Sequence, residues 1–146
     1  MSKKLAVTLS IFMLFCPAYA SLGQETFKIV VHEDLKTESV AKKKLSKIFL
    51  RKVKRWEDGQ EATPFDLSDD SQVREDFTRA VHKKKLSHIK SFWQRMIFSG
   101  RDNAPSELAN ESELLERIAR TPGSVGYVAA ETELPDGVKV LEITEK

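Results

Sequence analysis

The sequence predicts a small α/β protein in which helices and strands form layers. Two observations point to this class: segments rich in β-branched residues lie near both ends of the chain, and segments with apolar residues at helical spacing lie between them. Because a helix separates the first two expected strands, a crossover rather than a hairpin should join them.

Four strands are expected. "FKIVV", residues 27–31, is rich in β-branched residues and is typical of a buried strand. "ATPFDL", residues 62–67, is a shorter candidate, and its Pro64 predicts a place at a sheet edge or a strand end. Residues 124–130 and 138–143 should form the last two strands, because the turn residues "PDG" separate them.

Four helices are expected between these strands. Residues 39–50 place apolar side chains at helical spacing, with lysines on the opposite face. A second helix should begin at Ser71, a third should span 86–98 and end at Gly100, and a fourth should span 112–120. The apolar stripe of the third helix should face a core and consists of Leu86, Ile89, Trp93, Met96 and Ile97.

The first twenty residues have the pattern of a secretory signal. Two lysines precede an apolar run that is too short for a membrane-spanning helix, and small residues follow up to Ala20. We expect cleavage after Ala20, a single domain over residues 21–146, a periplasmic or secreted location, and no stable membrane insertion after cleavage. A retained anchor and a lipoprotein processed at Cys16 are the alternatives.

Cleavage would make the remaining chain nearly neutral. Residues 1–20 hold two of the 24 basic residues, none of the 22 acidic residues and the only cysteine. The rest would carry 22 residues of each sign, which removes the main support for nucleic-acid binding. Without cysteine its stability must come from packing.

No catalytic, metal or cofactor site is apparent in the sequence. His32, His82 and His88 are separated by the expected strands and helices and lack the spaced companions of a metal site. A Ser/His/Asp order, paired carboxylates and a glycine-rich phosphate loop are also missing from the sequence pattern. We therefore expect a protein that is not an enzyme and uses no cofactor and no metal.

One segment, "DSQVREDF" at residues 70–77, could hold an anion. It follows the expected strand 62–67 directly, and ligands of α/β sheets usually lie where strands end and helices begin. The candidate ligand-binding residues are Ser71, Gln72 and Val73 as donors and Arg74 as the counter-charge. Several carboxylates crowd the same turn, so an ordinary capped helix is the competing interpretation.

The order of five motifs resembles the periplasmic phosphate-binding proteins of ABC importers and their short relatives. These motifs are "KIVVH", "LSKIFLRKVKRWEDG", "DSQVREDF", "FWQRMIFSGR" and "PGSVGYV", and they cover nearly all of residues 27–143. The resemblance implies one three-layer lobe of the type II periplasmic binding protein fold, with about four or five strands and helices on both faces. It also implies that the full-length relatives close phosphate between two such lobes.

The sequence departs from that family at the anion seat. Where the family has Ser-Gly-Thr, this chain has Ser71-Gln72-Val73, and where an upstream arginine is expected it has Leu67. Only a serine and the helical Arg74 remain, beside several aspartates. We therefore expect a degenerate seat that binds phosphate or another small anion weakly or not at all.

A second interpretation is a module for a protein partner of the cell envelope, such as a sensor, that binds no small molecule. A lone lobe would leave exposed the face that a second lobe covers, and exposed apolar patches often mark interaction sites. The run from Lys42 to Arg55 also holds eight basic residues and no acid. That run is either a solvated face neutralised by neighbouring acids or a docking surface.

Overall fold

The structure is a computed structural model that describes residues 25–146. The signal expected at residues 1–20 lies outside the described residues.

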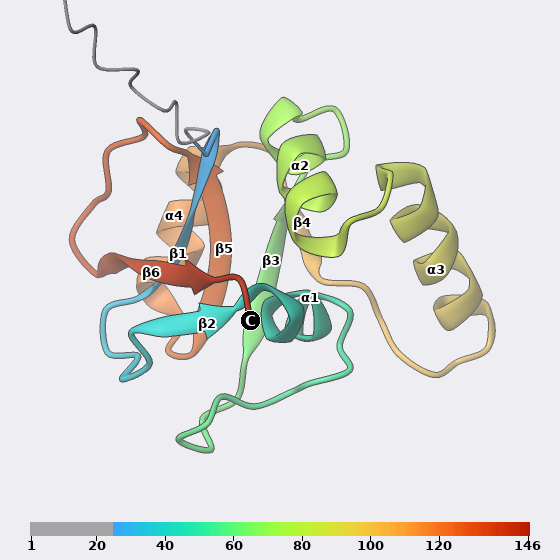
Figure 1. Cartoon of the computed structure of the whole chain (residues 1–146), viewed down its shortest axis with the longest axis horizontal. Coiled ribbons are helices and arrows are strands. Elements are labelled where there is room, and N and C mark those ends of the chain that lie inside the picture. Colours follow the sequence, from blue (N-terminus) through green and yellow to red (C-terminus); the bar gives the residue numbers. More distant parts are fainter. Residues whose placement is uncertain (1–24) are drawn as a thin grey trace, which may run out of the picture.

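A mixed sheet of six strands, in the order β2-β6-β1-β5-β3-β4, forms the centre of the described part (Figure 1). Strand β1 runs antiparallel to both of its neighbours, β5 and β6, whereas β2 with β6, β3 with β5 and β3 with β4 are parallel. The strands are β1 (Phe27–His32), β2 (Ser39–Ala41), β3 (Thr63–Leu67), β4 (Ser106–Leu108), β5 (Ser124–Ala129) and β6 (Val138–Thr144).

Helices cover both faces of this sheet, which confirms the predicted α/β class. Helix α4 lies on one face, and α1 and α2 lie on the other (Figure 1). A π-helical segment, η1, continues α2, and α3 follows it. The helical elements are α1 (Lys42–Phe49), α2 (Gln72–Phe77), η1 (Thr78–His82), α3 (Leu86–Phe98) and α4 (Glu111–Arg120).

Strand β5 explains how the two faces are packed. Its Gly126 faces α4, where a Cβ atom would lie only 2.8 Å from a methyl group of Leu114, so a larger residue would push the helix away. The next residue, Tyr127, faces the opposite way, and its ring stacks on Phe77 of α2 with 3.9 Å between centroids. Phe49 of α1 packs against both rings.

Two of the five motifs behind the resemblance, "LSKIFLRKVKRWEDG" and "PGSVGYV", meet in the core. The indole N–H of Trp56 donates a hydrogen bond of 2.8 Å to the carbonyl oxygen of Gly123. Gly123 has φ of +78°, and a Cβ atom there would lie 2.1 Å from the carbonyl oxygen of Glu61. These residues therefore have a structural role, in which a buried tryptophan and a glycine fix the entry to β5.

Two strands were not expected, which is why six are present instead of four or five. The first residues of the expected helix 39–50 form β2, so α1 begins at Lys42. Residues 106–108, which lie between the expected third and fourth helices, form β4 beside β3. Both are three-residue strands at the two edges of the sheet, and strands this short leave almost no periodicity in the sequence. Pro64 lies near the start of β3, which agrees with its expected place at a strand end.

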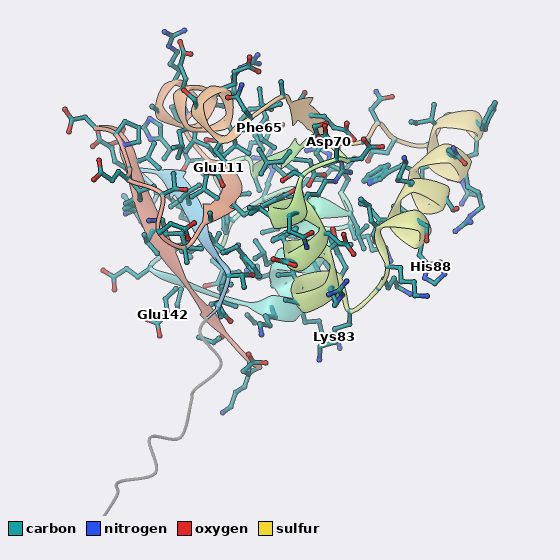
Figure 2. All side chains as sticks on the ribbon, turned by 90° about the horizontal axis from the view of Figure 1, so that it is seen from above. Phe65, Asp70, Lys83, His88, Glu111 and Glu142 are labelled. Carbon is teal, nitrogen blue, oxygen red and sulfur yellow. The ribbon has the colours of Figure 1, made fainter. Side chains whose placement is uncertain are left out.

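Helix α3 stands apart from the sheet in both views (Figures 1 and 2). Only Ile89 and Trp93 of its expected apolar stripe are buried, so the prediction that the whole stripe faces a core is wrong. Ile97 is 53% exposed and Phe98 is 91% exposed at the far end of the helix. None of the helices within residues 25–146 is both long and apolar enough to cross a membrane.

Candidate functional site

The expected anion seat lies where β3 ends and α2 begins. The backbone turns at residues 68–71, where the N–H of Ser71 donates to the carbonyl oxygen of Ser68. Asp70 lies at this end of the α2–η1 segment and Lys83 lies at the other end (Figure 2). The structure therefore places the four candidate residues in one turn at a strand end.

Three of these four residues make local contacts. The hydroxyl of Ser71 accepts a hydrogen bond of 3.2 Å from the N–H of Arg74, which makes Ser71 the N-cap of α2. The amide of Gln72 donates to the carboxylate of Asp76 over 3.0 Å. Val73 is half-buried and packs against the core. The Ser71 oxygen therefore already has one protein donor.

Arg74, the fourth residue, is only 3% exposed and is held by acceptors of the protein itself. Its Nη1 donates over 2.8 Å to the carbonyl oxygen of Leu67 and over 2.6 Å to Oε1 of Glu107. Its Nη2 lies 3.9 Å from Oδ2 of Asp66. Two carboxylates thus face a single guanidinium.

The pairing of β3 with β4 brings these carboxylates together. Asp66 and Glu107 are partners in the parallel register, so their side chains leave the sheet on the same face. Tyr127 of β5 shares this face, and its hydroxyl donates to Asp66 over 2.7 Å while accepting from the N–H of Leu67 over 3.1 Å. Helix α2 then lays Arg74 above the acidic pair.

The electrostatics of this cluster keep Arg74 charged. Burial alone would lower the pKa of Arg74, but Asp66 and Glu107 outweigh that effect and hold the pKa above its ordinary value. Burial raises the pKa of the Asp66 carboxyl, against the opposing effects of Arg74 and the Tyr127 hydrogen bond. Burial and the neighbouring Asp66 also raise the pKa of Tyr127 well above its ordinary value, so its hydroxyl keeps its proton.

The carboxylates that crowd the turn in the sequence mostly face other partners. Asp69 pairs with Lys90 of α3, and Glu75 pairs with Arg79 over 2.8 Å. Glu107 and Tyr127, which complete the cluster, were not among the expected site residues. Recognising Glu107 would have required the register of β4, which the sequence pattern does not reveal.

Half of the eight basic residues in the run from Lys42 to Arg55 form ion pairs within residues 25–146. The ion pairs shorter than 3 Å are Lys42–Glu145, Lys44–Glu57 and Lys54–Asp102. Lys52 forms no ion pair with any residue from 25 to 146. As for metal binding, no cluster of three or more suitable His, Cys, Asp or Glu ligands occurs within that same range.

A family model described as "PBP superfamily domain" matches residues 19–145 of the chain. No curated protein matches the sequence. An ABC-type phosphate transport receptor from Vibrio cholerae is 13% identical, with a TM-score of 0.63 over 81% of this chain and 46% of that one. PstS from Borrelia burgdorferi is 16% identical, with a TM-score of 0.62 over 81% of this chain and 47% of that one.

These similarities confirm the resemblance drawn from the motif order and the expected lobe of the type II periplasmic binding protein fold. The chain spans less than half of the length of the two solved structures. That coverage fits a single-lobe relative of two-lobe binding proteins.

Proposed function

The chain belongs to the PBP superfamily domain family, and on this premise we propose that it is an exported, phosphate-type solute-binding-like protein with a degenerate anion seat. It acts by binding and not by catalysis. The pattern of residues 1–20 supports export to the periplasm or the medium. The seat comprises Ser71, Gln72, Val73 and Arg74 at the start of α2.

The observation that carries this proposal is the 2.6 Å contact between Arg74 and Glu107. The guanidinium is buried, whereas the Glu107 side chain is 51% exposed and lies toward solvent. A small anion must therefore displace the Glu107 carboxylate to reach Arg74. Because the fold holds that carboxylate beside Arg74, it competes with a free anion for the guanidinium at a high effective concentration.

The two carboxylates at the seat also repel an incoming anion. Two unit charges 4 Å apart interact by about 4 kcal/mol at the effective dielectric of a protein surface. Asp66 and Glu107 together outweigh the single charge of Arg74 whenever both are ionised. A divalent phosphate would add repulsion that the N-terminus of α2, worth about 0.3–1 kcal/mol per charge, does not offset.

Calorimetric titration with inorganic phosphate tests the proposal. We expect the wild-type protein to show no saturable heat below about 1 mM, and Glu107→Gln to gain saturable binding in the low millimolar range, because the guanidinium is freed. The matched control is Glu116→Gln, which removes the acid of the exposed 2.6 Å pair with Arg120 and should leave binding unchanged. Micromolar binding by the wild type would refute the degenerate seat, and no binding by Glu107→Gln would refute any anion seat there.

A second candidate function is an accessory module for an envelope protein, without small-molecule binding. The exposed Ile97 and Phe98 at the free end of α3 favour it, because large apolar side chains are costly to leave in water. A photo-crosslinking residue at position 98 should give one defined product in cells, and the same residue at the exposed position 36 should not. Identical products from both positions would reject this candidate.

A further inference from the structure

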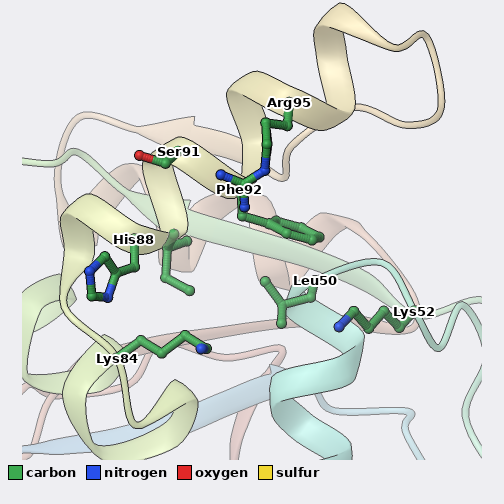
Figure 3. Close-up of a pocket in the computed structure, with 8 residues that line it drawn as sticks. Leu50, Lys52, Lys84, His88, Ser91, Phe92 and Arg95 are labelled. Atoms are coloured by element: carbon green, nitrogen blue, oxygen red, sulfur yellow. The ribbon is translucent and has the colours of Figure 1, made fainter.

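A cavity lies between the end of α1, the connection from η1 to α3, and α3 itself (Figure 3). Its volume is about 350 Å³, which is at the lower end of the range for small-molecule sites. No residue that lines it belongs to the cluster around Arg74, so the cavity is independent of the proposed anion seat.

The inner wall of the cavity is apolar. Leu50 follows the last turn of α1, and Ile89 and Phe92 lie one turn apart on α3, so their side chains share one face of that helix. Ile89 is buried and Phe92 is half-buried. These three side chains offer a surface for an alkyl or aryl group.

Three cations surround this wall. Figure 3 shows the ammonium groups of Lys52 and Lys84 directed from two sides into the space beside Leu50, with Arg95 turned toward Phe92. The Lys52 ammonium lies 5.6 Å from the centroid of the Phe92 ring. The lining contains no Asp or Glu.

The lack of counter-charge sets these cations apart from their neighbours. Lys54 pairs with Asp102, and Lys90 pairs with Asp69. Lys52, Lys84 and Arg95, by contrast, form no ion pair with any part of the chain that the structure describes. A neighbouring hollow shares Lys84 and His88 with the cavity and is otherwise lined by Arg79, Lys83 and Lys85, which extends the positive field.

Convergent cations without a counter-charge repel one another, and Leu50 and Phe92 in the apolar wall beside them stay partly exposed to water. An anion that brings an apolar group would relieve the repulsion and cover the wall. We propose that this cavity binds a small amphiphilic anion, whose alkyl or aryl body rests on Leu50, Ile89 and Phe92. Its carboxylate, sulfonate or phosphate head is held by Lys52, Lys84 and Arg95. The volume favours a small molecule over a peptide or a membrane surface.

Calorimetry with decanoate tests this site, with decyl maltoside as the uncharged amphiphile of equal chain length, both below their micelle concentrations. We expect saturable 1:1 binding of decanoate and at least about tenfold weaker binding of the neutral compound, because the cations select the head group. Octanoate should bind about tenfold more weakly than decanoate, since it lacks two methylene groups that would be buried.

Variants separate this site from general attraction to a basic protein. The double variant Lys84→Gln/Arg95→Gln should lose at least about tenfold in decanoate affinity. The matched control Lys36→Gln/Lys43→Gln removes the same charge from exposed lysines elsewhere and should bind decanoate as the wild type does. All four side chains are exposed, and equal thermal unfolding temperatures would show that both variants remain folded.

Four results would overturn the proposal: no saturable binding of decanoate, equal binding of decyl maltoside, equal affinity for octanoate, or equal losses in the two double variants. Binding to phosphatidylglycerol vesicles that decanoate does not displace would also overturn it, in favour of a membrane surface. Phosphate binding at Arg74 has no bearing on these outcomes, because its test changes Glu107 only.

Discussion

The imidazole of His82 should make the stability of this fold depend on pH in the mildly acidic range. Its Nδ1 lies 2.8 Å from the hydroxyl oxygen of Ser46, and its ring packs edge-on against Phe77 with 5.6 Å between centroids. Burial is the main cause that lowers the pKa of His82 from its ordinary value of 6.5 to about 4, and the nearby charges of Arg74 and Lys84 contribute to this shift.

The sign of the effect follows from proton uptake by the two states. The unfolded chain binds a proton at His82 below about pH 6.5, whereas the folded protein binds it only near pH 4. The contribution of neutral His82 is therefore fully present above about pH 6.5 and is lost as the pH falls toward 4. Between about pH 7.5 and about pH 4.5 this loss amounts to about 2.5 kcal/mol of unfolding free energy.

Urea unfolding of the wild type and of His82→Gln across this pH range measures the effect. The variant cannot take up the proton, so its unfolding free energy should fall by about 2.5 kcal/mol less than that of the wild type. Carboxylates titrate equally in both proteins and cancel in the difference. His88→Gln changes an exposed histidine and should follow the wild type. Parallel curves for the wild type and His82→Gln would refute the reasoning.

Three further predictions concern stability. Tyr127→Phe should cost about 1–3 kcal/mol in urea unfolding, because the N–H of Leu67 loses its acceptor; a loss below about 0.5 kcal/mol would argue against the cluster. Ser71→Ala should cost about 1 kcal/mol, and Ser71→Asp should not, because only the first removes the cap; equal thermal unfolding of the two would contradict this. Gly100→Ala should cost about 1–2 kcal/mol, because Gly100 has φ of +65° in open space. Gly123→Ala should cost about 1–3 kcal/mol more, because its Cβ would also meet a backbone oxygen; equal losses in chemical denaturation would exclude the clash.

The sequence predicted those elements whose signal is local. Strand β1 is rich in β-branched residues, and the apolar spacing of α4 matches its buried residues, so both were found. The cap at Ser71 was one of two local interpretations of the turn, and the structure places Ser71 in that position. Each of these elements is determined by side chains within a few positions of one another.

Features that depend on distant contacts escaped sequence reasoning. The role of Glu107 arises only when β4 pairs with β3 and brings it beside Asp66. The exposed end of α3 was missed for a related reason. Helical spacing shows that one face is apolar, but it does not show whether another element covers that face. Much of the α3 stripe is left without a cover within residues 25–146.

The pairing of the cations predicts which of the two sites an anion should prefer. Arg74 is already matched by two carboxylates, so an added anion there gains little net attraction. Lys52, Lys84 and Arg95 face a cavity without a carboxylate, so an anion that enters it gains the full interaction. Weak phosphate binding that survives Glu107→Gln unchanged but disappears in Lys84→Gln/Arg95→Gln would therefore assign the anion to the cavity. Phosphate binding that strengthens in Glu107→Gln and is unchanged in Lys84→Gln/Arg95→Gln would assign the anion to the seat, because each variant changes only one of the two sites.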